Sequence, residues 1–357
     1  MTPAEPVDWE LAERIAVRVA GTDPFAGSYH ADSLVPDFAE LTAEAEELVA
    51  TATGLRSLQG PARARVADRP AWVRANIASF RRLLRPLTER LGARLSGPLA
   101  PMTRKAAGAE VGVLLGWMST RVLGQYDMLL VEDEHADQQD LVYYVGPNVL
   151  ALEKRYAFPP REFRLWLSLH EVTHRAQFTG VPWLRDHFVS LVDKSLGAVD
   201  PDPTRILHAF RRLAGAARDR RNPLSDGGLA ALFATPEQAD VLAQIGGLMS
   251  LLEGHGDVTM DRAGADRIPS AERFGRVLRA RRRAVSPAIR FVQQLIGLEA
   301  KLEQYEQGER FIAAVEAEGG PELLNRAFEA PIYLPSLAEI RDPGRWIERV
   351  RVNAAAV

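Results

Sequence analysis

Two histidines four residues apart, with a glutamate directly after the first, are the residues of this sequence best suited to chemistry. They are His170, Glu171 and His174. Residues four apart on an α-helix point in nearly the same direction, so both imidazoles can bind one metal ion. Zinc lowers the pKa of a bound water to about 7. The pattern H-E-x-x-H therefore predicts zinc-dependent hydrolysis of a carbonyl compound, with Glu171 as the general base.

The alternative interpretation of this segment is a pair of core histidines that bind no metal. Burying two imidazoles and a carboxylate on one arc of a helix is costly unless these groups have partners, which favours the metal site. The chain contains no cysteine, so thiolate ligands and disulfides are excluded. A metal must then be held by imidazole and carboxylate groups, and this combination suits Zn²⁺ well.

A catalytic zinc needs a third protein ligand and an open position. The extended metzincin pattern is absent, because Gln177 stands where that pattern has glycine and Gly180 where it has histidine. The best candidate is Glu253, which is predicted to end a helix over Pro236–Glu253. A glutamate from a later helix is the gluzincin arrangement. His255 is the alternative third ligand.

Small residues precede Glu253 on the same side of its predicted helix. Gly246 and Ser250 lie two turns and one turn earlier, and they would let this helix pack closely against the helix with the metal motif. If Glu253 binds the metal, His255 becomes a candidate for orienting ligands or stabilising an oxyanion. Tyr333 is a further candidate catalytic residue, as a phenolic donor, although packing in its proline-rich segment is the simpler interpretation.

The periodicity of apolar residues predicts a mainly α protein with a small β element. Glycines recur every four residues at Gly108, Gly112 and Gly116, so a neighbouring element could approach this helix closely. Two strands are predicted, at Met128–Val131 and Leu141–Val145. Helices are predicted at about Asp8–Val19, Phe38–Ala52, Trp72–Leu84, Leu87–Leu95, Ala106–Leu123, Arg161–Phe178, Trp183–Leu196, Thr204–Ala214, Pro236–Glu253, Ser270–Arg283, Pro287–Val315 and Pro321–Phe328.

Length and composition limit the domain organisation and the class of protein. The best candidate boundary is the Gly- and Pro-rich segment Ser96–Pro101, which separates a helical region over 1–100 from a zincin-like metal-binding domain over 101–357, although the two could form one compact unit. The net charge of -3 argues against a nucleic-acid partner. No secretory signal and no membrane-spanning apolar run is evident, so we expect a cytoplasmic protein without a membrane partner.

Several segments resemble a family of actinobacterial zincin-like hydrolases, long catalogued as a domain of unknown function. Some of its members are associated with biosynthesis of the deazaflavin coenzyme of those bacteria. The resemblance implies a mainly helical zincin-like fold and a metal at His170, His174 and Glu253, and it implies no substrate. It spans nearly the whole chain, and the matching segments are Leu123–Asp127, Leu169–Phe178, Leu252–His255 and Gln304–Gly308 with Phe311.

Two classes of function follow from these observations. The first is a zinc metallohydrolase, a peptidase or an amidase, whose substrate is an unidentified peptide or amide. The second is a non-catalytic zincin-like binding or accessory protein, in which the metal stiffens the core and His255 closes the coordination shell as a fourth ligand. A link to deazaflavin coenzyme biosynthesis rests on the resemblance alone.

Overall fold

The computed structural model is mainly helical with one small sheet, which confirms the predicted fold class. Its elements are found in two compact units, and each unit is described by itself. Unit 1 is Met1–Gly180 with Thr259–Phe274, and unit 2 is Val181–Val258 with Gly275–Val357. The structure describes residues 5–85, 100–126, 140–197, 236–283 and 298–355.

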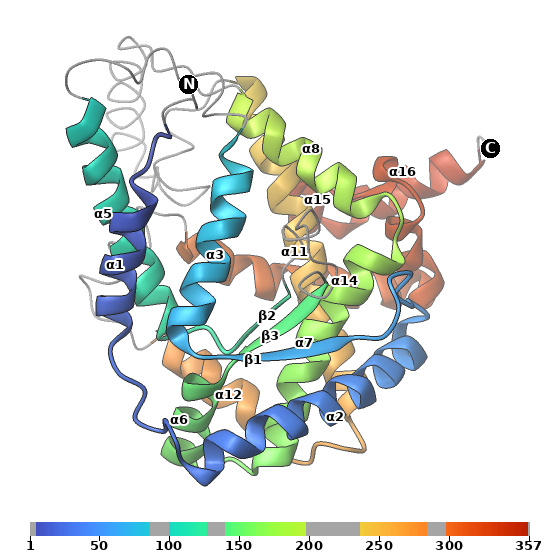
Figure 1. The fold of residues 1–357 in the computed structure, drawn as a ribbon. Coiled ribbons are helices and arrows are strands. Elements are labelled where there is room, and N and C mark those ends of the chain that lie inside the picture. Colours follow the sequence, from blue (N-terminus) through green and yellow to red (C-terminus); the bar gives the residue numbers. More distant parts are fainter. Residues whose placement is uncertain (1–4, 86–99, 127–139, 198–235, 284–297, 356–357) are drawn as a thin grey trace. The chain divides into compact units, whose positions relative to one another are not determined.

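Unit 1 contains a three-stranded sheet in the order β1-β3-β2 (Figure 1). The central strand β3 (Leu141–Val145) runs parallel to β1 (Arg63–Ala67) and antiparallel to β2 (Gly124–Tyr126). The strand predicted at Leu141–Val145 is confirmed. The strand predicted at Met128–Val131 lies outside the described residues, and the described partners of β3 are β1 and β2.

Both faces of β3 are buried, which explains why its sequence is a continuous apolar and aromatic run. On one face Tyr144 stacks on Phe38 of α2 (Tyr29–Thr53), with ring centroids 3.9 Å apart, and its hydroxyl shares a 2.8 Å hydrogen bond with Thr42. On the other face Val145 joins an apolar cluster. The other buried members of this cluster are Val7, Trp9, Ala16, Trp72, Val73, Ile77 and Leu115.

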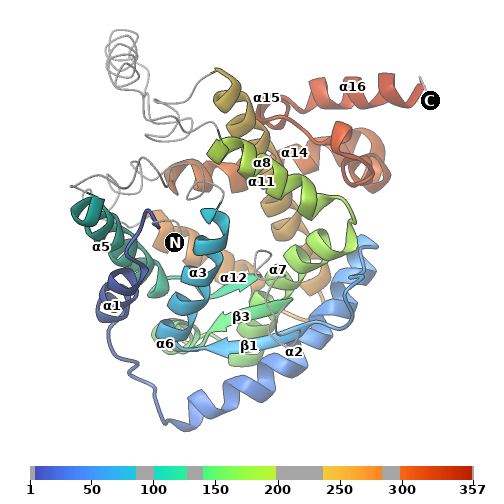
Figure 2. The same ribbon diagram turned by 45° about the horizontal axis from the view of Figure 1, so that its top comes forward.

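Helices α1 (Trp9–Ala20) and α5 (Ala100–Ser119) lie side by side in unit 1 (Figures 1 and 2). The glycines that recur every four residues on α5 face α1. A Cβ placed on Gly112 would lie 2.6 Å from the backbone oxygen of Ala12, which is closer than atoms of these types can approach. The close approach predicted from the glycine spacing is confirmed, and the neighbouring element is α1.

A buried arginine joins three helices of unit 1. Arg164 of α7 (Pro160–Gly180) donates to both carboxylate oxygens of Glu153 on α6 (Gly146–Tyr156), at 2.8 and 2.9 Å, and also contacts Asp37 of α2. The Arg164 side chain is only 3% exposed, so this charge depends on its two carboxylate partners. Helix α7 is thereby fixed near its first turns, before the residues of the metal motif.

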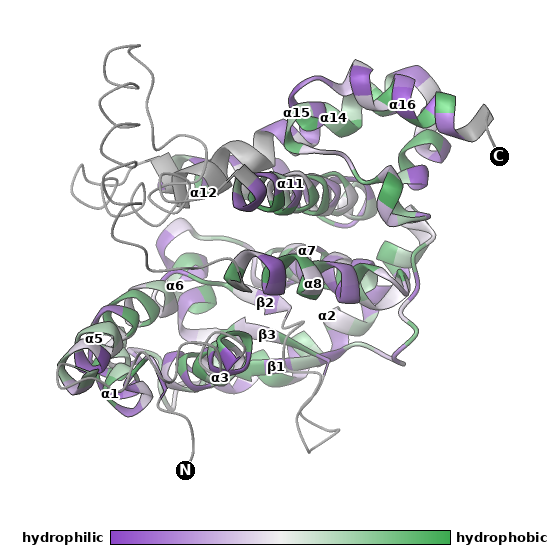
Figure 3. Ribbon diagram, turned by 90° about the horizontal axis from the view of Figure 1, so that it is seen from above, coloured by the Kyte–Doolittle hydropathy of each residue, from purple (hydrophilic) through white to green (hydrophobic). Residues whose placement is uncertain are grey.

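Unit 2 is helical in the part of the chain that the structure describes. Its core places Phe311 against Trp346 with ring centroids 5.3 Å apart. Figure 3 colours α16 in both purple and green turns, as expected for a helix with one apolar face. Its elements are α8 (Leu184–Gly197), the first part of α11 (Pro236–Gly264), most of α12 (Ala271–Arg283), α14 (Leu298–Asn325), η4 (Arg326–Phe328), η5 (Pro331–Tyr333), α15 (Leu337–Arg341) and α16 (Pro343–Ala355).

Helix α11 differs from the sequence prediction. The prediction that it ends at Glu253 is wrong, because the helix continues to Gly264. The glycine at position 254 is explained by packing instead: a Cβ there would lie 2.4 Å from the backbone carbon of Gly308 on α14. Ser250 belongs to the same contact, since its carbonyl oxygen would lie 2.1 Å from a Cβ on Gly308. These small residues therefore serve an approach between α11 and α14.

Some predicted features lie outside the described residues or stay untested. The helices predicted at Leu87–Leu95 and Thr204–Ala214 fall on residues that the structure leaves undescribed, as does most of the segment at Ser96–Pro101. The domain boundary predicted there stays a prediction. Among the described helices, none combines the length and the apolar character needed to cross a bilayer.

Substituting Gly112 tests the contact between α1 and α5. At an exposed helix position a Gly→Ala change raises the free energy of unfolding by at most about 1 kcal/mol. We expect Gly112→Ala to lower the free energy of unfolding by about 1–3 kcal/mol instead, because the added methyl group must displace the backbone of α1. Urea denaturation measures the change. Val113→Ala is the matched control, since Val113 is 53% exposed on the same helix. Equal midpoints for both variants would contradict the close contact.

Candidate metal site

The two motif histidines converge on one point. His170 and His174 lie four residues apart on α7, and both side chains are half-buried. Their Nε2 atoms are 3.2 Å apart, with the two rings nearly perpendicular at 86°. Two nitrogens bound to one tetrahedral zinc at roughly 2.0–2.1 Å would lie about 3.3 Å apart. The spacing of these nitrogens therefore fits a shared zinc ion.

Gln177 orients the second of these imidazoles. Its side-chain oxygen lies 3.0 Å from Nδ1 of His174, one turn further along α7, and the Gln177 side chain is fully buried. An amide oxygen can only accept a hydrogen bond, so Nδ1 carries the ring proton and Nε2 keeps the lone pair that a metal requires. The residue that breaks the metzincin pattern is thus the hydrogen-bond partner of a candidate metal ligand.

The carboxylate of Glu171 lies against strand β2. Its Oε2 accepts a hydrogen bond of 3.0 Å from the backbone N–H of Tyr126. The other end of the strand leaves room for it, because a Cβ on Gly124 would lie 2.6 Å from both Cγ and Oε1 of Glu171. Glu171 is 8% exposed. A buried carboxylate is therefore held beside the two imidazoles of α7 by the backbone of an edge strand.

Strand β2 is itself anchored on its other side by helix α3 (Arg69–Leu83). The indole Nε1 of Trp72 donates to the side-chain oxygen of Gln125 at 2.8 Å. The amide nitrogen of Gln125 donates to Asn76 at 3.2 Å. These bonds fix a strand of only three residues, so the N–H group that meets Glu171 has a defined position.

Tyr144 contributes to the electrostatic surroundings of Glu171. Burial raises the pKa of the Tyr144 phenol well above its ordinary value, and the charge of Glu171 raises this pKa further. Hydrogen bonds from its side-chain neighbours lower the pKa, by less than burial raises it. The phenol therefore keeps its proton at neutral pH and serves β3 as a packing and hydrogen-bonding group.

The remaining candidate residues belong to unit 2. Glu253 and His255 lie on α11 and are 5% and 6% exposed, and the His255 ring packs at 5.1 Å from that of Phe328. Tyr333 is buried in η5, where its backbone oxygen accepts a hydrogen bond from Trp346. Metal binding by Glu253 and the catalytic roles of His255 and Tyr333 stay predictions.

Sequence reasoning missed three contributors to this site. Gln177 could have been found, because it lies three residues after His174 on the same side of a predicted helix. Gly124 and Tyr126 could not, since Gly124 acts through the absence of a side chain and Tyr126 acts through its backbone. Their segment carries the family resemblance, which gave it no role.

A family profile described as zincin-like metallopeptidase matches residues 7–347. The chain belongs to the zincin-like metallopeptidase family. A crystal structure from Chloroflexus aurantiacus, of a protein provisionally described as a hydrolase with a novel fold, is 32% identical in sequence. It superposes with a TM-score of 0.70 over 97% of this chain and 99% of that one. A search of the curated proteins found no significant match.

Membership of the zincin-like metallopeptidase family confirms the resemblance found in the sequence and supports a metallohydrolase. The family implies a metal ion, usually zinc. The two imidazoles of unit 1 fit such an ion, because imidazole nitrogen is a common zinc ligand and because the Nε2 atoms of His170 and His174 have the separation that zinc requires.

Replacing Gln177 tests its role in orienting His174. We expect Gln177→Leu to weaken zinc affinity by about 10- to 100-fold, because the Nδ1 proton of His174 loses its acceptor. Competition with a chromophoric chelator measures the affinity. Thr173→Val is the matched control: Thr173 is buried on α7, but its hydroxyl donates to the Leu169 carbonyl. Unchanged affinity in Gln177→Leu would remove Gln177 from the metal site.

Proposed function

We propose that this protein is a zinc-dependent peptidase or amidase, in which His170 and His174 bind zinc and Glu171 is the general base. One observation carries the proposal. Two imidazole nitrogens 3.2 Å apart share one helix with a buried carboxylate held by a strand edge, in a chain of the zincin-like metallopeptidase family. The two imidazoles can serve as metal ligands, and the carboxylate can serve as the base.

Zinc, when bound, lowers the pKa of a water molecule to about 7 and polarises a carbonyl group. Glu171 takes a proton from the water that attacks the carbonyl carbon, and passes it to the nitrogen that leaves as the C–N bond breaks. The products are a carboxylic acid and an amine. The Tyr126 N–H binds Oε2 of Glu171, so the carboxylate does not have to be reoriented between the two proton transfers.

Glu253 completes the ligand set in this proposal. Its carboxylate is of the type that a catalytic zinc accepts beside two histidines. Its helix also has a link to the motif helix: α11 continues from Glu253 to Gly264, where a Cβ would lie 3.3 Å from Leu169, the residue before His170.

The same helix argues against a closed, non-catalytic metal shell. Glu253 and His255 are two residues apart on continuous helix, so their side chains leave it about 160° apart in direction. The His255 ring also packs on Phe328. Two ligands to one ion from these positions would conflict with that geometry, which supports a zinc site that keeps a position for water and substrate.

Parallel variants of α11 test the third ligand. We expect Glu253→Gln to lower zinc affinity at least 100-fold, because a neutral amide is a poor zinc ligand. His255→Gln, two residues away on the same helix and equally buried, should bind one zinc per chain as the parent protein does. Elemental analysis after dialysis against a weak chelator measures how much zinc each variant retains. Loss of zinc in His255→Gln together with retention in Glu253→Gln would make His255 the ligand.

A single substitution tests the general base. We expect Glu171→Gln to retain zinc and to hydrolyse a pool of internally quenched fluorescent peptides about 10²–10⁴-fold more slowly, because proton transfer is lost while the metal remains. Glu47→Gln is the control, since Glu47 is a largely exposed carboxylate of α2 that pairs with Arg56. Hydrolysis at the parental rate by the Glu171 variant would overturn the role assigned to Glu171.

A further inference from the structure

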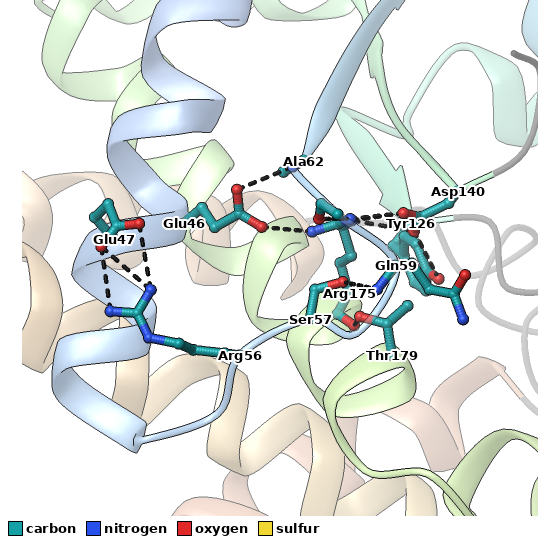
Figure 4. Close-up of polar contacts among 11 residues, drawn as sticks. Glu46, Glu47, Arg56, Ser57, Gln59, Ala62, Tyr126, Asp140, Arg175 and Thr179 are labelled. Carbon is teal, nitrogen blue, oxygen red and sulfur yellow. Dashed lines mark hydrogen bonds and ion pairs between the residues drawn. The ribbon is translucent and has the colours of Figure 1, made fainter.

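The residue after His174 is a buried arginine with an unusually complete set of partners. The Arg175 side chain is 1% exposed. Its Nε and Nη2 donate to the two carboxylate oxygens of Asp140 at 3.0 and 2.6 Å, which makes a bidentate ion pair. Its Nη1 donates to Glu46 at 2.6 Å (Figure 4). Its Nη2 also donates to the Gly60 carbonyl at 2.7 Å.

Asp140 stands at the point where the chain enters strand β3. Its backbone is in the left-handed region, with φ 54°, a conformation that costs a residue other than glycine about 1–3 kcal/mol. Its Oδ1 also accepts a hydrogen bond of 3.2 Å from the hydroxyl of Tyr126, the last residue of β2. The ion pair with Arg175 therefore fixes the start of β3 and the end of β2 together.

These contacts form a closed ring that begins and ends on α7. Glu171 accepts from the backbone N–H of Tyr126, the Tyr126 hydroxyl donates to Asp140, and Asp140 pairs with Arg175. Arg175 is four residues after Glu171, so both side chains leave α7 on similar sides. One tyrosine thus contacts the general base through its backbone and the ion pair through its side chain.

We propose that Arg175 and Asp140 are positioning residues, which hold strand β2 where the Tyr126 N–H meets the carboxylate of Glu171. Their importance for catalysis rests on the proposed function, whereas the coupling between Asp140 and the Tyr126 amide does not. Arg175 touches neither substrate nor metal in this proposal. It acts through the strand.

The second ion pair of Arg175, with Glu46, provides a matched control. Glu46 accepts from Arg175 through Oε1 and from the backbone N–H of Ala62 through Oε2 (Figure 4). Glu46 therefore joins α2 to the segment before β1. Asp140→Asn and Glu46→Gln each remove one carboxylate charge from the same guanidinium. The Asp140 side chain contacts the hydroxyl of Tyr126, whereas the Glu46 side chain contacts the backbone of Ala62. A purely structural role predicts similar effects for both variants, and the positioning role predicts different ones.

Selective labelling with ¹⁵N-tyrosine gives a readout that needs no substrate. The chain has seven tyrosines, and Tyr126→Phe identifies the Tyr126 amide signal by its loss. In the zinc-loaded full chain, we expect Asp140→Asn to shift this signal and to speed its hydrogen exchange at least tenfold. Glu46→Gln should leave the signal in place. An unmoved Tyr126 signal in Asp140→Asn, or an equal shift in Glu46→Gln, would overturn the inference.

Tyr126→Phe keeps the test decisive if Asp140→Asn does not fold. It removes the bond from the hydroxyl to Asp140 and leaves both partners of the Asp140–Arg175 ion pair in place. With ¹⁵N-phenylalanine labelling, the amide at position 126 is the one signal added to the parental set. Its hydrogen exchange should be several-fold faster than that of the parental Tyr126 amide, and an unchanged exchange rate would refute the coupling.

A double-mutant cycle then links the coupling to catalysis. With the same peptide pool, we expect Asp140→Asn to lower kcat about tenfold with KM and zinc content unchanged. In the Glu171→Gln background it should cause no further loss, because Asp140 acts through Glu171. If the double variant had a kcat lowered by the product of the two single effects, the positioning role would be refuted. Absence of hydrolysis by the parent protein would refute the proposed function instead, while the amide signals still decide the coupling.

Discussion

Helix α7 has to aim two imidazoles at one point while most of its other residues are buried. It spans 21 residues, and its buried positions run almost without interruption from Phe163 to Thr179. The separation of the two Nε2 atoms is set by the rise and turn of an α-helix, which packing on several sides holds rigid. The two imidazoles therefore lie close together without any loop having to become ordered around them.

The parts of the protein that follow from local periodicity could be predicted from the sequence. The helix around His170 and His174, the close approach at Gly112 and the strand at Leu141–Val145 each rest on spacing within a few residues. Strand β1 could not be predicted in this way, because Arg63 and Arg65 do not mark a buried strand. It exists because it pairs with β3.

The partner of Glu171 is a second feature that sequence reasoning could not supply. A backbone N–H is present at nearly every residue, so only the fold determines that Tyr126 is the one that meets the carboxylate. The structural role of each glycine was ambiguous in the sequence for a related reason. Gly254 directly follows the helix end that was predicted at Glu253, but it allows α11 and α14 to approach, while Gly124 leaves space for a charged side chain. Which role a glycine has depends on the element opposite it.

The pairing of β1 with β3 has a consequence for the order in which this molecule matures. Arg63 lies beside Leu141 and Ala67 beside Val145, so the sheet closes only after a long stretch of intervening chain has been synthesised and brought back. Contacts between such distant segments form late during folding, because the entropy of closing the loop must be lost first. Within the described residues, strand β2 pairs with β3 alone. Helix α7 can therefore form, with its paired imidazoles, before Glu171 acquires its backbone donor. A nascent or partly unfolded chain would then have its two imidazoles aligned while the carboxylate of Glu171 is still unrestrained.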